Sequence, residues 1–411
     1  MASSETQVPL APSLSRVARG SLCSGCGGCA AAAPGKVRME TKAPGYLRPT
    51  QIKTLTPEED RLIVAICPGL GQTVEAAGRR DEVLWGPYAS VFTGWANDAE
   101  IRHAGSSGGV LSAIILHLVE TGVVDAVIEN TAAADFPIGN APLIARSKED
   151  VIGGAGSRYA PSSPLADLPT HVASGLRHAF VGKPCDAVAL RALAARDASV
   201  ARAFPVILSF FCAGVPSHAG GREVLAKLGT SLEETTAFRF RGNGWPGRAT
   251  ALLRSGESRS MSYHDSWGGI LSRHVQHRCK VCADGTGVAA DIVCADAWES
   301  DENGYPLFEE RDGVSLVMAR TAKGQSLIDA AVAAGKITVE PFDIATLAAI
   351  QPGQRDRRRA LAARLLALRL LGRPIPVYKG LRIAAAARQN TWRKNLRNFL
   401  GTARRVFRSA L

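Results

Sequence analysis

The segment GSSGGVLSAIILHLVETGVVDAVI, residues 105–128, decides the fold that we expect for this chain. Its apolar residues first recur at helical spacing over residues 110–119, and a short apolar run at residues 123–128 then has the length of a buried strand. Ionisable residues such as His117 and Asp125 interrupt the stretch, which argues against a membrane-spanning helix. A helix that leads directly into a buried strand is typical of layered α/β proteins.

The same alternation continues on both sides of this segment. Five further strands are predicted, at residues 90–95, 179–181, 205–211, 292–295 and 315–319. Helical periodicity predicts further helices at residues 187–195, 222–228 and 325–334. The pattern as a whole predicts a mixed α/β (α+β) fold.

Length and composition predict two or three compact units. The chain has 411 residues, 46% of them hydrophobic and 21% charged, and a domain averages about 150 residues. These values exclude a disordered chain, a collagen-like chain and a disulfide-stabilised miniprotein. Changes in composition set off a flexible leader at residues 1–20, a cysteine-rich cluster region at residues 21–80 and a basic helical tail at residues 346–411.

The formal charge of +12 is concentrated in the tail. From Arg355 to Leu411 there are 16 Lys or Arg residues and one acid, Asp356, so the rest of the chain carries a net charge of −3. We expect this tail to form an amphipathic arm that docks on the body or on a partner, with peripheral contact to an anionic membrane as the second interpretation. No nucleic-acid-binding motif accompanies the charge, so no nucleic-acid partner is expected.

The N-terminus and the cysteine content indicate in which cellular compartment the protein is expected. The first 20 residues contain no apolar run long enough for a signal peptide, and no segment of the chain has the length of a membrane span. We therefore expect a cytoplasmic protein. Thiols stay reduced in the cytoplasm, so the nine cysteines favour metal or redox chemistry over disulfides.

Three cysteines form the most specific motif, Cys23-Ser-Gly-Cys26-Gly-Gly-Cys29. Two-residue spacers let three thiolates face one cuboidal cluster, and small spacer residues let backbone N–H groups reach the sulfur atoms. Zinc sites more often pair two separated CxxC knuckles, so the triplet favours an iron–sulfur cluster, with a zinc knuckle or unrelated thiols as alternatives. Cys67, followed by Pro68, is the best candidate for the fourth ligand despite its long separation from the triplet.

Four other cysteines are dispersed along the chain. Cys185 and Cys212 each follow a predicted strand, and Cys279 and Cys282 form a CxxC pair. Loops at strand ends converge in α/β folds, so the four thiols could meet. Zinc, a redox dithiol and a cluster all remain open for them. Cys294 lies within a predicted strand and is interpreted as a core thiol.

A glycine- and serine-rich loop leads into the helix predicted from residue 110. The loop consists of Gly105, Ser106, Ser107, Gly108 and Gly109. Ser106 or Ser107 can cap the helix, and the free N–H groups at a helix start favour an anion such as a phosphate or the electron-rich edge of a flavin. Turn chemistry alone can also explain such a loop, and it does not match the GxGxxG dinucleotide motif.

A second segment, GSRYAPSSP at residues 156–164, offers a cation in Arg158 and an aromatic ring in Tyr159. It could hold a pyrophosphate or an isoalloxazine ring, or it could be an ordinary linker. The sequence contains no visible Ser/His/Asp arrangement, HExxH motif or P-loop, which leaves hydrolase and ATPase functions without support.

Several short motifs follow one another in a distinctive order. They are the cysteine triplet, Gly86-Pro87, and residues 102–109, 156–159, 182–185, 211–214, 279–284 and 290–292. In this order they resemble the coenzyme F(420) (F420) hydrogenase/dehydrogenase beta-subunit family, over a stretch from about residue 20 to about residue 335. The resemblance implies that the α/β part of the chain, between the cysteine-rich region and the tail, forms two domains, at residues 81–170 and 171–345. One departure is Cys294-Ala295-Asp296-Ala297-Trp298, where the family tends to have glycine before the aspartate; it removes no expected ligand.

The resemblance implies an iron–sulfur flavoprotein oxidoreductase with FAD and one or two 4Fe-4S clusters. Electrons would pass between ferredoxin or a partner redox subunit, the clusters and FAD, with hydride exchange to a small organic substrate such as coenzyme F420. The implied cluster ligands are Cys23, Cys26, Cys29 and Cys67 for one cluster, and Cys185, Cys212, Cys279 and Cys282 for the other. The implied flavin-binding residues are Gly105, Ser106, Ser107, Gly108, Gly109, Arg158, Tyr159 and Lys183.

Within this picture, Lys183 and Arg158 are the predicted catalytic residues, as stabilisers of an anionic reduced flavin, and their alternative interpretation is ordinary surface charge. A non-catalytic electron-transfer subunit and a reductase of a polysaccharide or tetrapyrrole pathway are alternative functions. A zinc-stabilised binding protein is the alternative outside redox chemistry.

Overall fold

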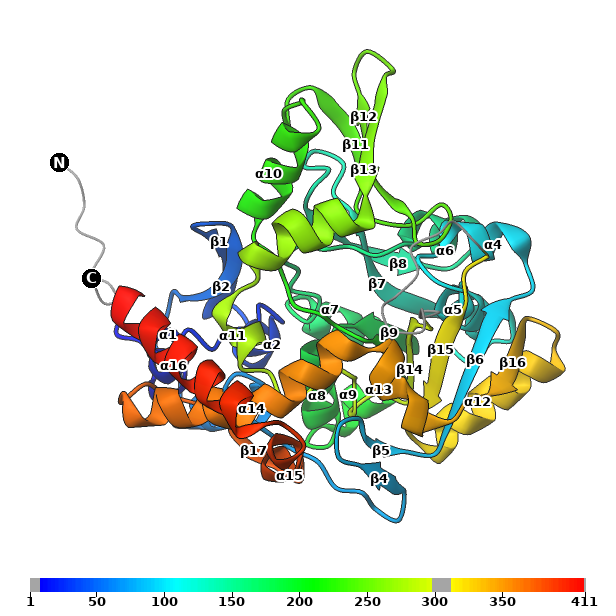
Figure 1. Cartoon of the computed structure of the whole chain (residues 1–411). Helices are drawn as coiled ribbons and strands as arrows, with labels where there is room; N and C mark the ends of the chain where they lie inside the picture. The colour runs from blue at the N-terminus through cyan, green and yellow to red at the C-terminus, as the bar shows by residue number, and fades with distance from the viewer. Residues whose placement is uncertain (1–7, 298–311, 410–411) are drawn as a thin grey trace.

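The computed structural model describes residues 8–297 and 312–409 (Figure 1). Its centre is an eight-stranded sheet with the strand order β16-β6-β15-β14-β10-β9-β7-β8. The mixed α/β fold predicted from the sequence is confirmed. The strands are β6 Ser90–Ala96, β7 Ala126–Ala132, β8 Asn140–Ala145, β9 His178–Gly182, β10 Val206–Phe210, β14 Ile292–Asp296, β15 Ser315–Ala319 and β16 Ile337–Pro341.

Four neighbouring strands in the middle of this sheet, β14, β10, β9 and β7, run parallel to one another. All residues of β9 are buried because both faces of the sheet are covered. Ala179 and Val181 belong to the core on one face, whereas Phe180 belongs to the core on the other. Parallel strands place their carboxyl ends at one edge, which is where open α/β sheets bind ligands.

Helices cover both faces of the central sheet. The helix predicted from residue 110 is α5, and the core that it shares with α12 contains Val110, Ile114 and Leu118. On this first face, α5 spans Val110–Glu120 and α12 spans Ala322–Ala333. The core on the opposite face contains residues of four helices, α3 Pro57–Ile66, α7 Leu168–Ala173, α8 Pro184–Ala194 and α9 Ala198–Ala203.

A smaller sheet stands apart from the central one, at the top of Figure 1. It forms a separate core with α10 and the helical turns η1 and η2, in which Phe238, Phe240 and Leu271 are buried. Sequence periodicity predicted only α10 of this lobe. The bounds are β11 Thr235–Arg239, β12 Arg248–Leu253, β13 Ser258–Ser262, α10 His218–Lys227, η1 His264–Ile270 and η2 Leu271–His274.

The N-terminal region differs from its prediction. The sequence predicts a flexible leader up to residue 20, but residues Pro12–Arg19 form helix α1, whose Leu14 and Val17 are buried. Ser13 Oγ donates to Asp60 Oδ1 at 2.5 Å, which ties α1 to α3. Residues 1–7 of the predicted leader lie outside the described residues. The cysteine-rich region adds α2 Gly28–Ala32 and the hairpin β1 Val37–Lys42 with β2 Tyr46–Gln51.

The C-terminal tail is helical and folds back onto the body, with α14 against both α15 and α16 (Figure 1). None of the helices in the described ranges is long and apolar enough to cross a membrane. The remaining bounds are α14 Pro352–Leu370, α15 Ile383–Arg388, α16 Trp392–Ser409, α4 Ala99–Ala104, α6 Lys148–Gly154, α11 His277–Lys280, α13 Leu347–Ile350, η3 Ile344–Thr346, β3 Gly71–Thr73, β4 Arg80–Glu82, β5 Gly86–Tyr88 and β17 Val377–Lys379.

Candidate functional site

A cavity of about 270 Å³ lies at the carboxyl ends of the parallel strands. Lys183 follows β9, Cys212 follows β10 and Asp296 ends β14, and all three line the cavity. Glu129 of β7 completes this wall. The sheet therefore brings together side chains from four segments that are distant in sequence, at the edge where α/β sheets bind ligands.

The loop of residues 105–109 reaches the cavity where α5 begins. The expectation that Ser106 or Ser107 caps this helix is wrong: Gly109 occupies the N-cap with a φ of +74°, and no side chain caps the helix. An added Cβ at Gly109 would lie 2.8 Å from the backbone of α4, so a larger residue does not fit this turn. Uncapped N–H groups at a helix start attract anions, and Val110 at this start lines the cavity.

Gly108 is the loop residue that does not line the cavity. Its N–H donates to Ser315 Oγ at 2.9 Å, and an added Cβ would lie 2.5 Å from the carbonyl oxygen of Gly94. This contact holds the loop against the central sheet. The other four predicted loop residues line the cavity: Gly105, Ser106, Ser107 and Gly109.

Arg158 and Tyr159 also line the cavity, but with different contacts. The Arg158 guanidinium donates to three backbone carbonyls at 2.5 to 2.9 Å, and burial lowers its pKa to about 10. These bonds tie the segment to the small sheet and favour a positioning role for Arg158. The Tyr159 ring lies 4.8 Å from that of Trp267, so the two rings form an aromatic wall.

Lys183 is a buried cation on the cavity wall. Its Nζ lies 2.7 Å from Asp186 Oδ2 and donates to Ser162 Oγ at 2.7 Å. Burial alone would lower the pKa of Lys183, but the carboxylate of Asp186 raises it above its usual value. The side chain therefore presents a fixed positive charge beside the cavity and beside Cys185.

Glu129 is the acid that the sequence did not single out. Its side chain is buried, and within the described part of the chain nothing donates to its Oε1. An added Cβ at Gly154 would lie 2.8 Å from this oxygen, so the carboxyl is packed against the end of α6. Burial, with a smaller effect from Asp150, raises the pKa of Glu129 to about 8. The carboxyl thus holds a proton near neutral pH.

Replacing Glu129 by glutamine is expected to remove a pH-dependent penalty on folding. The folded pKa exceeds the unfolded value, so the stabilisation from Glu129 is complete in acid and is lost as the pH rises through about 8. Between pH 5 and pH 9, wild type should lose about 4 kcal/mol of unfolding free energy relative to Glu129→Gln, as measured by urea denaturation. Glu149→Gln, at an exposed position on α6, is the control, and parallel pH profiles for wild type and Glu129→Gln would contradict the prediction.

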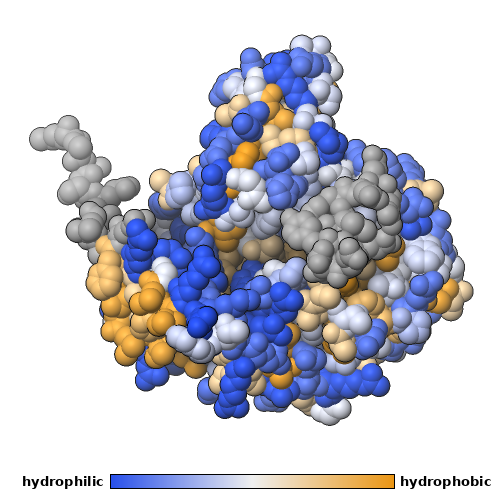
Figure 2. Space-filling view, in the orientation of Figure 1, coloured by the Kyte–Doolittle hydropathy of each residue, from blue (hydrophilic) through white to orange (hydrophobic). Residues whose placement is uncertain are grey.

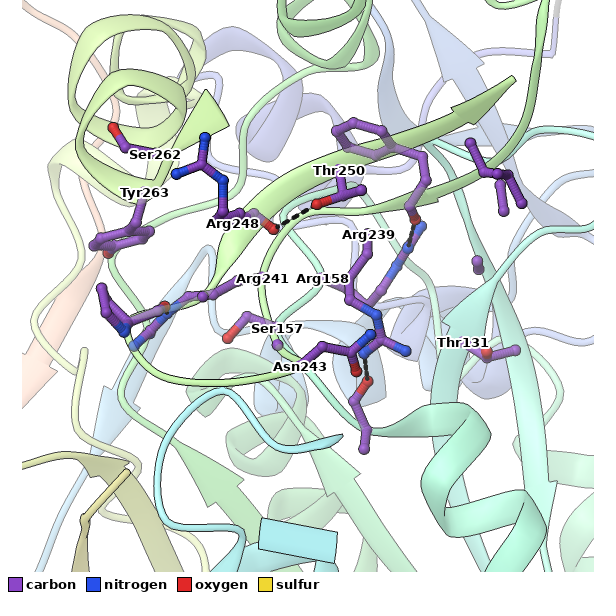
Figure 3. Close-up of a pocket in the computed structure, with 18 of the residues that line it drawn as sticks. Thr131, Ser157, Arg158, Arg239, Arg241, Asn243, Arg248, Thr250, Ser262 and Tyr263 are labelled. Atoms are coloured by element: carbon purple, nitrogen blue, oxygen red, sulfur yellow. Dashed lines mark hydrogen bonds between the residues drawn. The ribbon is translucent and has the colours of Figure 1, made fainter. Parts of the chain in front are cut away.

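A second cavity, of about 540 Å³, adjoins the first (Figure 3). Arg241 and Tyr263 line both cavities. The Arg241 guanidinium makes two hydrogen bonds to Asp296, at 2.7 and 2.8 Å, and stands 4.7 Å from the Tyr263 ring. Figure 3 shows Arg158, Arg239 and Arg248 around the same space. This cavity is therefore suited to an anionic molecule placed beside the first cavity.

The first cysteine group surrounds one small void between α1, α2 and α3. Cys23, Cys26, Cys29 and Cys67 all line this void. Cys67 directly follows α3, so the hairpin and this helix occupy the long sequence gap and return the fourth thiol to the triplet. The Gly25 N–H donates to Cys23 Sγ at 3.3 Å, the type of contact that stabilises cluster thiolates.

Cys26 of this group is buried and the other three cysteines are half-buried, and their charges affect one another's pKa. Burial raises the pKa of Cys26 to about 12, and the charges of Cys67 and Cys23 contribute to the increase. Burial likewise raises the pKa of Cys67 to about 11. Such thiols remain protonated near neutral pH unless a cation replaces the protons, which is how a metal centre binds.

The second cysteine group lies beside the first. Burial and then Cys279 raise the pKa of Cys212 to about 12, and Cys282 adds to this effect. Burial and Asp186 are the largest causes of the raised pKa of Cys185, and the charges of Cys212 and of Cys26 from the first group add to them. The two groups are therefore close enough to interact.

Arg278 connects the two cysteine groups. Its side chain is buried, and its Nη2 donates to the carbonyl of Pro68 at 2.7 Å. Burial alone would lower its pKa, but Tyr378 and the thiols of Cys282 and Cys185 raise it above its usual value. Burial raises the pKa of the half-buried Cys23, and the charges of Arg48 and, to a smaller extent, Arg278 oppose this increase. Nε and Nη1 have no hydrogen-bond acceptor among the described residues, so two donors are left for groups that would bind between the thiols.

The residues around the two cysteine groups indicate which kind of metal centre could bind there. Within residues 8–297 and 312–409, no three Cys, His, Asp or Glu side chains converge to hold a single metal ion. Thiols around a shared void with N–H donors, and a buried cation with two unpartnered nitrogens, fit an anionic iron–sulfur cluster. Cys294 lies within β14 in the core of the central sheet, as the sequence predicted, and it also lines the cavity.

Comparison with known proteins agrees with this arrangement. The N-terminal model of "Coenzyme F420 hydrogenase/dehydrogenase, beta subunit" matches residues 91–168, and the C-terminal model matches residues 175–345. Together the two models cover more than half of the chain. The chain belongs to this family. It is therefore an oxidoreductase-type electron-transfer protein.

Named relatives of this beta-subunit protein act with coenzyme F420. It is 25% identical to the coenzyme F420 hydrogenase subunit beta of Methanococcus voltae, over 71% of this chain and 99% of the relative. It is 27% identical to the coenzyme F420-dependent sulfite reductase of Methanocaldococcus jannaschii, over 55% of this chain and 34% of that protein. A chain of the F420-reducing NiFe hydrogenase complex from Methanosarcina barkeri shares the fold, with a TM-score of 0.52, 21% identity, and coverage of 68% of this chain and 95% of that one.

Sequence reasoning missed several residues of this beta-subunit site. Glu129 looks like an ordinary strand residue, and the pairing of Arg241 with Asp296 joins residues 55 positions apart. Trp267 has no motif around it. A signal did exist for Arg278, because it directly precedes the CxxC pair.

Proposed function

We propose that this protein passes electrons between two 4Fe-4S clusters and FAD, and that the flavin exchanges hydride with an organic substrate such as coenzyme F420. The observation that carries the proposal is the adjacency of the two cysteine groups and the cavity. The charge of Cys26 in the first group contributes to the raised pKa of Cys185 in the second, and Cys212 of the second group lines the cavity. With both clusters and FAD bound, this order of sites would provide a route for electrons.

The proposed ligands are the eight cysteines named from the family resemblance. Cys23, Cys26, Cys29 and Cys67 would hold one cluster, and Cys185, Cys212, Cys279 and Cys282 the other. Arg278 would neutralise part of the negative charge of both. Cys185 lies in the first turn of α8, where the helix dipole favours a thiolate.

The cavity at the strand ends is the proposed FAD site. Bound there, FAD would supply the conversion between one-electron and two-electron transfer. The uncapped start of α5 would bind a phosphate, and the wall of Tyr159 and Trp267 would orient and shield the ring from water. Lys183 would place positive charge beside the ring, and Glu129 would hold a proton at its carboxyl group.

The second cavity is the proposed substrate site. Its arginines favour an anionic organic molecule, and its common wall with the first cavity, formed by Arg241 and Tyr263, would place that molecule next to the flavin. This room for a substrate favours an enzyme over a non-catalytic electron-transfer subunit. Because named relatives are subunits of a hydrogenase complex, we also propose a partner redox subunit or ferredoxin as the electron donor or acceptor.

Anaerobic purification tests the proposal. We expect a yellow-brown protein with about eight iron and eight acid-labile sulfide per chain, and one FAD released on denaturation. The visible spectrum should bleach with dithionite, and the reduced protein should reduce coenzyme F420. A colourless protein that contains zinc instead of iron and flavin would refute the proposal. A correctly loaded protein that reduces no F420 would point to a different organic substrate.

A further inference from the structure

Helix α16 packs on the body through a mostly polar side, to which Val406 adds one contact with an apolar core. Asn398 Oδ1 accepts a hydrogen bond from Arg364 of α14 at 3.1 Å, and Asn395 Nδ2 donates to the carbonyl of Ala387 at 3.1 Å. Thr402 on the same side is buried. A surface helix of a soluble protein normally turns its apolar stripe to the core, so this helix has the opposite orientation.

The apolar stripe of α16 faces away from the body. Trp392, Leu396, Leu400 and Phe407 are 69%, 47%, 56% and 60% exposed, and their spacing places them on one face of a helix. Leu370, at the end of α14, is 68% exposed. Figure 2 shows apolar side chains gathered where α14 ends beside α16, with hydrophilic side chains next to them.

Basic side chains border this apolar stripe. Arg393, Arg397 and Arg404 of α16 are exposed. Burial lowers the pKa of Lys280, and the nearby charges of Arg405 and Arg364 lower it further. Positive charges are therefore crowded on this side of the molecule, and an anionic surface would relieve their repulsion.

We propose that α16 and the end of α14 bind peripherally to an anionic phospholipid surface. The apolar stripe would enter the interface, and the arginines along its edge would contact the lipid headgroups, as in amphipathic helices that lie on membranes. Charge favours this occupant over a second copy, because two tails that each carry a net charge of +15 repel one another. The proposal concerns a surface separate from the cavities and cysteine groups, so it does not depend on the proposed redox function.

Vesicle sedimentation of the full-length holoprotein tests the proposal. The protein should pellet with phosphatidylglycerol-rich vesicles, remain in solution with phosphatidylcholine vesicles, and be released by high salt. Leu400→Glu and Arg397→Glu should each weaken binding by about tenfold or more. Iron and flavin content should not change, because neither residue lies at a cavity or cysteine group.

Val332→Glu and Lys323→Glu are matched controls, because both residues are exposed on helix α12 and neither lines either cavity. They should bind vesicles like wild type. Equal losses in the control variants, or no binding of wild type to anionic vesicles, would overturn the proposal. A different outcome would identify the stripe as a contact between copies of the chain. In that case wild type would not bind vesicles and would sediment as a dimer, and Leu400→Glu would sediment as a monomer.

Discussion

Replacing Cys212 by alanine is expected to remove about half of the iron and acid-labile sulfide from the anaerobically purified protein. Cys212 belongs to the cysteine group that adjoins the cavity, so its cluster would lose a ligand while the group around Cys23 stays complete. Alanine is preferable to serine because a serine oxygen can replace a thiolate. The measurement is iron and sulfide per chain, with the electron paramagnetic resonance spectrum of the reduced protein to identify the cluster that remains.

Cys294→Ala is the matched control for this prediction. Cys294 also lines the cavity and is buried, but it lies in β14 within the core of the sheet. We expect this variant to retain all of its iron. Cys29→Ala should give the complementary loss, with the spectrum of the second cluster preserved. Equal iron content in Cys212→Ala and Cys294→Ala would show that Cys212 is not a cluster ligand.

Local periodicity predicted the parts of the fold in which packing follows the sequence pattern. The helix predicted at residues 110–119 is α5, and the strand predicted at residues 315–319 is β15. The strands of the small sheet were missed for two reasons. β12 does alternate, but its inward residues Ala249 and Ala251 are small, and β11 and β13 alternate too weakly to differ from loops. α1 was interpreted as part of a leader because its two buried apolar residues, Leu14 and Val17, gain their partners only through tertiary contacts.

Some residues of the candidate site could likewise be predicted from the sequence, and others could not. Chemical motifs such as the cysteine triplet are readable because ligand geometry requires fixed spacing, and the glycine loop is readable because its turn requires small residues. Burial cannot be read from the sequence, so the proton-holding Glu129 became visible only in the fold. The burial of Arg278 also became visible only there, although its position before the CxxC pair is a sequence signal. Ser106 and Ser107 illustrate the opposite error: both are good cap residues, but the left-handed Gly109 takes the cap position.

Arg278→Met is expected to lower the reduction potentials of both clusters. A reduced cluster carries one more negative charge than an oxidised one, so a buried cation between two clusters favours reduction of each. At an effective dielectric constant of about 20, a unit charge about 8 Å away contributes about 2 kcal/mol, which corresponds to roughly 90 mV for one electron. Loss of the donors Nε and Nη1 should lower the potentials further, because hydrogen bonds to cluster sulfur raise them.

Redox titration followed by electron paramagnetic resonance measures this effect. Arg278→Lys keeps the charge and should keep most of the potential, whereas Arg273→Met, at an exposed position of η2, should leave both potentials unchanged. A second measurement uses protein without clusters. There Arg278 is a buried cation with two unpartnered nitrogens, so Arg278→Met should stabilise the fold and raise the unfolding free energy by about 2 kcal/mol. Unchanged reduction potentials in Arg278→Met would exclude a charge-compensating role. A side chain needed only for packing would instead destabilise the cluster-free protein when it is replaced.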